Sequence, residues 1–151
     1  MTKRLTFAAA DFVASAAVQR SLDRRYAPVA ITVLDAAGAP IVTKRMDGCS
    51  SVGFPQFASA KATTAIVMKT SSRDFRDKYT KEPAQAAKYC QMLAMVNITG
   101  GNMAPFPGGV AIRGNGDEVL GAVGVSGASA DEDEDCALAG VAAAKEAGLL
   151  S

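Results

Sequence analysis

Residues 28–46 read PVAITVLDAAGAPIVTKRM, and this stretch decides the fold class. Residues 29–35 form an almost continuously apolar run rich in β-branched side chains, which is typical of a central strand. The small residues at 36–39 then indicate a turn, and residues 40–46 resume an extended pattern. The stretch therefore predicts a β-hairpin whose first strand lies in the interior of a sheet.

A second hairpin is predicted nearer the C-terminus, where residues 109–113 and 119–125 have strand-like composition and residues 114–117 form a turn. Strands that come in hairpins, and do not alternate with helices, indicate an α+β fold with an antiparallel sheet. The charged residues of 69–88 indicate a solvated lobe of short helices. Longer helices are predicted by apolar side chains at helical spacing over residues 7–25, 55–68, 84–96 and 130–147.

The composition fits one folded domain over residues 1–151. The chain is 49% hydrophobic and 21% charged, close to globular averages. Its 16 basic and 15 acidic side chains nearly cancel, so no basic excess favours nucleic acid or an anionic membrane surface. No apolar stretch is as long as a membrane span. The three cysteines form no C-x-x-C pair, which favours reduced thiols and a cytoplasmic location.

The sequence contains no histidine. This excludes Ser-His-Asp and Cys-His nucleophilic sites, histidine-ligated zinc, and haem held by a proximal histidine of this chain. We predict no metal site. Any chemistry therefore depends on carboxylates, lysine, tyrosine, thiols, hydroxyls, backbone groups or a bound cofactor.

Four segments carry a resemblance to a known family. In chain order they are PVAITVLD at 28–35 with Gly38 and Met46-Asp47-Gly48, ASAKATTA at 58–65, FPGGVAI at 106–112, and GAVGVSGA at 121–128 leading to DEDCALAG at 133–140. With these segments in this order, the chain resembles the GlcG/HbpS family, which also supplies the C-terminal domain of PduO-type proteins. The similarity covers nearly the whole chain.

The resemblance implies a profilin-like α+β fold, with a five-stranded antiparallel sheet flanked by helices. It also implies homo-oligomers with ligand sites near the subunit contacts. Some members of the family bind haem or take part in haem and iron handling, and others are associated with glycolate or diol metabolism. Haem is therefore a cofactor that the resemblance implies, and without histidine it would be held by Tyr89, by a methionine or cysteine, or without ligation of its iron.

Lys61, the glycine pair Gly108-Gly109, and Ser126 are candidate ligand-binding residues. Lys61 interrupts a helix of small residues, where its side chain can reach over a sheet edge into a cleft, or remain an exposed or ion-paired lysine. Gly108 and Gly109 precede a strand and allow a ligand or another backbone to approach closely, or they form a tight turn or bulge. Ser126 lies just before the last helix, where it suits a carboxylate or phosphate, or forms a simple capping turn.

Asp133 and Glu134 are candidate carboxylates for a general base or for binding a cation. Because consecutive helix positions point about 100° apart, the two do not converge on one site by themselves. The alternative is a run of solvated acids that interact favourably with the helix dipole. Both interpretations stay open at this point.

Phe106 is the aromatic candidate for a ligand pocket. Together with three methionines it can line an adaptable apolar pocket, or these side chains can fill the core. Cys136 is interpreted as structural, because its neighbours in the helix are small and its acidic surroundings oppose a reactive thiolate. The methionines concerned are Met92, Met95 and Met103.

Three functions remain open. The first is a small-ligand-binding protein of the GlcG/HbpS type, with tetrapyrroles as the ligand class that the resemblance implies. The second is a cofactor-independent lyase, isomerase or hydratase acting on a small oxygenated acid or aldehyde, with Lys61 polarising the substrate and Glu134 as the base. The third is an oligomeric partner-binding protein without a ligand. We expect a homo-oligomer, formed through the small-residue faces of helices 58–65 and 136–147.

Overall fold

The structure is a computed structural model that describes residues 3–50 and 54–151. The described chain contains helices before, between and after two β-hairpins, in the α+β order that the sequence predicts, and the charged stretch expected to form short helices contains one over Ser72–Thr80. The elements are α1 (Phe7–Asp23), β1 (Ala30–Asp35), β2 (Pro40–Arg45), α2 (Phe54–Met68), α3 (Ser72–Thr80), α4 (Ala86–Ile98), β3 (Gly109–Arg113), β4 (Val119–Ser126) and α5 (Ala130–Glu146).

The two hairpins join into one antiparallel sheet with the strand order β2-β1-β4-β3. Strand β1 is central, as its apolar run predicts, with Ile31 paired to Lys44 on one side and to Val125 on the other. The prediction of five strands is wrong, because the sheet formed by the described residues has four. That number came from the family resemblance. In this chain the described residues between the hairpins form helices, and the connection over 99–108, rich in glycine and proline, adds no strand.

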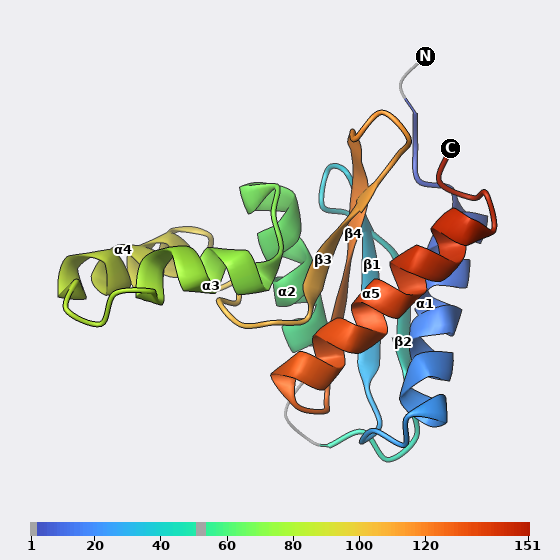
Figure 1. Cartoon of the computed structure of the whole chain (residues 1–151), viewed down its shortest axis with the longest axis horizontal. Helices are drawn as coiled ribbons and strands as arrows, with labels where there is room; N and C mark the ends of the chain where they lie inside the picture. Colours follow the sequence, from blue (N-terminus) through green and yellow to red (C-terminus); the bar gives the residue numbers. More distant parts are fainter. Residues whose placement is uncertain (1–2, 51–53) are drawn as a thin grey trace.

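Helices cover both faces of the sheet (Figure 1). Helices α1 and α5 pack on one face over the main core, which contains Val13, Ile31 and Val123. Helix α2 packs on the other face, where Ala62 and Ala65 contact Leu34 and Ala122. The small-residue faces predicted for self-association are therefore used inside the chain.

Two glycines set how closely the layers approach. A Cβ atom at Gly124 of β4 would collide with the backbone of Ala58 in α2, and one at Gly140 of α5 would meet the carbonyl oxygen of Val13 in α1 at 2.5 Å. The helices can lie this close only because no side chain is present at these positions. Helix α2 is thereby brought close to the strands that hold the candidate site.

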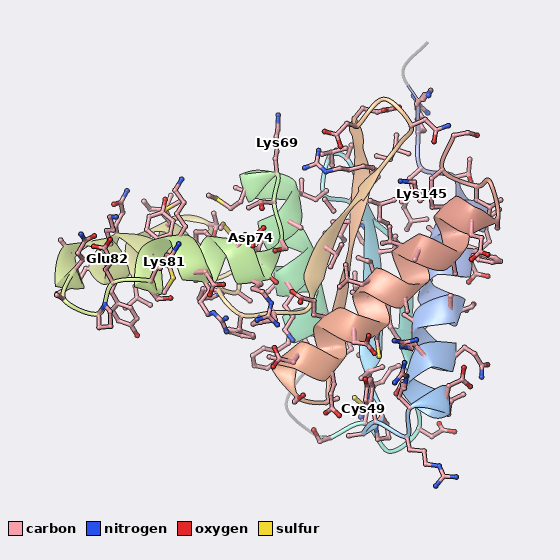
Figure 2. The ribbon with its side chains drawn as sticks, in the orientation of Figure 1. Cys49, Lys69, Asp74, Lys81, Glu82 and Lys145 are labelled. Carbon is pink, nitrogen blue, oxygen red and sulfur yellow. The ribbon has the colours of Figure 1, made fainter. Side chains whose placement is uncertain are left out.

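Helices α3 and α4 project from the side of the sheet as an arm (Figure 1). The arm has its own small core of Phe75, Met92 and Met103. Its outer surface is charged, and Figure 2 shows Asp74, Lys81 and Glu82 on it. Helix α4 also exposes large apolar side chains, namely Tyr89, Leu93 and Ile98.

Side chains cap the starts of two long helices. Thr6 caps α1 by accepting a hydrogen bond from the backbone N–H of Ala9. Ser129 and Glu132 form a capping box at the start of α5. No helix in the described part of the chain is long and apolar enough to cross a membrane.

Candidate functional site

A buried ion pair between Lys61 and Asp133 lies at the centre of the candidate site. The Lys61 Nζ donates hydrogen bonds to Asp133 Oδ2 at 2.8 Å and to the carbonyl oxygen of Val125 at 3.0 Å. The exposed fractions of the two side chains are only 2% and 3%. Lysine and aspartate are rarely buried so completely unless they are paired. Lys61 is thus an ion-paired interior residue and not an exposed one.

Burial shifts both groups toward their neutral forms. It lowers the pKa of Lys61 and raises the pKa of Asp133, while the attraction and hydrogen bond between the two oppose both shifts. The backbone N–H of Ala128 also donates to Asp133 Oδ1 at 2.9 Å, which favours the carboxylate. A lysine with a lowered pKa and an acid with a raised one are therefore held side by side.

The glycine pair makes room for this lysine. A Cβ atom at Gly108 would lie 2.5 Å from the carbonyl oxygen of Val125 and 2.6 Å from Cδ of Lys61, and one at Gly109 would collide with the backbone of Lys61. The φ angle of Gly108 is +133°, which favours glycine. In the described structure, Lys61 and the carbonyl oxygen of Val125 make the close approach at these glycines.

A surface hollow of about 340 Å³ opens over the ion pair, and we call it the Ser126 hollow. Ser126 itself is 7% exposed, and its hydroxyl has no hydrogen-bond partner within residues 3–50 and 54–151. The lining consists of Ser50, Phe57, Lys61, Phe106, Ser126, Gly127, Ala128, Ala130 and Asp133.

A second, more apolar hollow of about 370 Å³ adjoins the first, and we call it the Met103 hollow. The two hollows share Phe57 and Phe106, whose ring centroids lie 6.5 Å apart at an interplanar angle of 44°. Nζ of Lys61 lies 5.3 Å from the centroid of the Phe106 ring, within the range of a cation–π contact. The remaining lining consists of Gln56, Ala60, Val96, Gly101, Met103, Ala104 and Pro105.

Glu134 is not among the described residues that line the two hollows. Both of its carboxylate oxygens accept hydrogen bonds from Nε of Arg73 in α3, at 2.9 and 3.0 Å, and Arg73 also pairs with Asp131. Asp133 and Glu134 thus diverge, as their consecutive helical positions predict. Arg73 therefore links the arm to α5. The sequence of the charged stretch 69–88 does not predict this contact.

The remaining candidates lie outside the two hollows. Tyr89 is exposed on α4, and Met92 belongs to the core of the arm. Cys136 is fully buried, and burial, together with the charges of nearby acids, raises the pKa of its thiol to about 12. Phe57 was not predicted as a lining residue. Its spacing from the other apolar residues of 55–68 indicated only that it belongs to one face of a helix.

Fold and site define this chain as an α+β domain with a ligand-sized hollow over a buried ion pair. The chain belongs to the HbpS-like family: the family's model, described as "Haem degrading protein HbpS-like", matches residues 5–142. This confirms the resemblance stated from the sequence motifs.

Two curated relatives are described as the corrinoid adenosyltransferase PduO. The PduO of Salmonella typhimurium (strain LT2) is 32% identical over 128 residues, which cover 85% of this chain and 35% of the relative. The PduO of Citrobacter freundii is 32% identical over 139 residues, which cover 92% of this chain and 38% of the relative. The chain therefore spans little more than a third of the length of these relatives.

Solved structures share the architecture. A complex of PduOC with haem superposes with a TM-score of 0.79 at 29% identity, covering 93% of this chain and 95% of the other. A double mutant of HbpS from Streptomyces reticuli gives 0.77 at 27%, covering 94% and 88%. The protein ORFY of Klebsiella pneumoniae gives 0.82 at 23%, covering 96% and 94%, which shows a common fold alone.

Proposed function

We propose that this chain binds a small amphipathic molecule with a flat apolar body and a polar edge, the chemical class to which tetrapyrroles belong. The observation that carries the proposal is the Phe57–Phe106 pair, which forms a common wall between an apolar and a polar hollow. Each hollow lies within the size range of small-molecule sites, at its lower end. A ligand across the pair contacts both environments at once.

Each hollow contacts a different part of the proposed ligand. The apolar body packs on the phenyl rings and on Met103, whose thioether adapts to irregular shapes. The polar edge meets the unpartnered hydroxyl of Ser126 and the Lys61 ammonium, whose described hydrogen bonds use two of its three N–H donors. Asp133 stays occupied in holding that ammonium in place.

The relatives support a macrocyclic ligand. One similar structure is described as a complex with haem, and the curated relatives are named for a corrinoid, which is a modified tetrapyrrole. If haem binds, its iron can be ligated by Met103. Among the described residues that line the two hollows, Met103 is the one methionine, and there is no histidine, cysteine or tyrosine. Bound haem would supply redox and oxygen chemistry that the protein side chains lack.

Titrations with haemin and with metal-free protoporphyrin IX test the proposal. We expect both to bind saturably, because the phenyl wall and the polar edge do not require the iron. We expect Met103→Leu to change the absorption spectrum of the haemin complex while leaving the affinity for protoporphyrin IX within about threefold. If neither compound binds saturably, the proposed ligand class is wrong.

The Lys61–Asp133 pair favours a second candidate, an enzyme acting on a small oxygenated acid or aldehyde. A hydrogen on the carbon next to the substrate carbonyl would pass as a proton to the Asp133 carboxylate. Its electron pair would remain on the substrate as an enolate, and the Lys61 ammonium would stabilise the oxygen. Asp133 takes the place expected of Glu134, because Glu134 is paired with Arg73.

Exchange of the carbon-bound hydrogens of glycolaldehyde in D₂O, followed by NMR, tests this candidate. The protein should accelerate the exchange, and Asp133→Asn should abolish the acceleration. Asp131→Asn, which changes an exposed acid nearby, should keep it. If the exchange rate equals that of a solution without protein, the proposed enzymatic activity on this substrate class is wrong.

We also propose that the chain self-associates, as the family resemblance implies. Since the faces first expected to mediate contact are used inside the chain, the exposed apolar residues of α4 are the surface that self-association would cover. Light scattering should give a mass above the 15.5 kDa of one chain, and Leu93→Glu should reduce it. A mass of one chain at all micromolar concentrations would contradict the proposal.

A further inference from the structure

A third hollow lies beside α2, over the β1–β2 hairpin, and we call it the Thr32 groove. Its volume is about 660 Å³, and it adjoins the Met103 hollow at Gln56 and Ala60. None of the described residues that line it is charged or aromatic. The neutral polar side chains that line it are those of Thr32, Thr43, Gln56, Ser59, Thr63 and Asn102.

These polar side chains come from separate parts of the chain. Thr32 and Thr43 are paired in register across β1 and β2, so both lie on the sheet face that α2 covers only in part. Ser59 and Thr63 are one helical turn apart on α2 and therefore share one side of the helix. Strand and helix thus present hydroxyl groups to the same space from two directions.

The hydroxyl of Thr32 lies in the floor of the groove without a partner. Thr32 is 2% exposed, and its Oγ1 makes no hydrogen bond within the described residues. Thr64, a buried threonine on the neighbouring helix, shows the usual arrangement: its hydroxyl donates to the carbonyl of Ala60 and accepts from the N–H of Ala104, both at 2.8 Å. A buried polar group that lacks such partners requires an explanation.

We propose that the Thr32 groove binds a neutral polyhydroxylated small molecule. Hydroxyl and amide groups can each donate and accept, so they match the hydroxyl groups of such a ligand. The absence of charge from the described lining disfavours an ion, and the absence of aromatic rings distinguishes the groove from the Phe57–Phe106 site. The inference does not rest on the proposed function, since none of its argument uses that site.

An NMR titration of the ¹⁵N-labelled chain with sorbitol tests the proposal. Sorbitol serves as the probe because it is neutral and carries hydroxyl groups along its whole length. The informative variant is Thr32→Val, which keeps the shape of a β-branched strand residue and removes only the unpartnered hydroxyl. The matched control is Thr80→Val, because the Thr80 hydroxyl donates only to the carbonyl of Arg76 on the arm.

We expect saturable shifts of the backbone amides of Gln56, Ser59 and Thr63, with half-saturation below about 50 mM. Thr32→Val should weaken this binding at least fivefold while melting at or above the wild-type temperature, and Thr80→Val should leave it unchanged. Shifts that stay linear in sorbitol concentration would overturn the proposal. So would equal binding by Thr32→Val, or amides that respond to protein concentration alone, which would place a second copy of the chain in the groove.

Discussion

Nζ of Lys61 in α2 lies 2.8 Å from Oδ2 of Asp133 in α5, and both side chains are almost completely buried. The two helices lie on opposite faces of the sheet, so the contact passes its edge and joins the two layers. The pair also lines the Ser126 hollow. One contact therefore links the packing of the domain to its candidate ligand site.

Removing one member of this pair should destabilise the fold. Lys61→Met keeps the length of the apolar stem but leaves the Asp133 carboxylate buried without its cation. Breaking a buried ion pair in this way costs about 3–5 kcal/mol. Urea unfolding should show that loss for Lys61→Met, and the double variant Lys61→Met with Asp133→Asn should recover most of it. An unchanged unfolding midpoint for the single variant would contradict the burial of the pair.

Adding a methyl group at Gly109 should also destabilise the fold. In Gly109→Ala the new Cβ collides with the backbone of Lys61, and a backbone atom cannot move aside as a flexible side chain can. Overpacking of this kind costs typically about 1–3 kcal/mol or more. Gly116→Ala in the exposed turn is the control, since its Cβ would meet only the side chain of Glu118. Equal melting temperatures for the two variants would argue against close packing of α2 on β3.

The cysteines should differ sharply in reactivity. Cys90 is exposed, whereas Cys49 and Cys136 are buried. Burial raises the pKa of Cys136 to about 12, so its thiol stays protonated and unreactive at pH 8. Mass spectrometry after brief treatment of the native chain with iodoacetamide should find modification at Cys90. Modification of Cys136 at a comparable rate would show that this part of the core opens.

Asp135 should make stability depend on pH in acid. Two hydrogen bonds from Arg20, at 2.8 and 2.9 Å, and one from the Tyr26 hydroxyl at 2.8 Å hold the pKa of Asp135 below its usual value. A depressed pKa adds stability above the unfolded value of about 3.9, and the contribution is lost as pH falls through the folded value. The difference in unfolding free energy between wild type and Asp135→Asn should therefore shrink from pH 5 to pH 2. A constant difference would contradict this assignment.

Much of the fold could be predicted because its signals are local. The apolar run and β-branched content of 28–46 predicted the first hairpin and the central position of β1, and the apolar spacing over 130–147 predicted α5. The number of strands could not be read in this way, because it depends on which segments pair. The count of five rested on the resemblance, and the described structure has four.

The candidate site depends on contacts that no local pattern contains. Lys61 and Asp133 are 72 residues apart, and Arg73 and Glu134 are 61 apart. The sequence left open whether Lys61 reaches into a cleft or is an exposed or ion-paired lysine, because the fold determines its partner. Phe57 becomes a neighbour of Phe106 only when α2 lies on the sheet.

The most direct test of the proposed function is a fluorescence titration of protoporphyrin IX with the wild-type chain and with Phe106→Ala. Phe106 borders both hollows, so its removal takes away part of their common wall. Leu22→Ala, which truncates an exposed side chain on α1 outside both hollows, is the control. We expect saturable binding that Phe106→Ala weakens about tenfold or more, equivalent to about 1.4 kcal/mol, and that Leu22→Ala does not change. Equal affinity for wild type and Phe106→Ala would contradict this expectation.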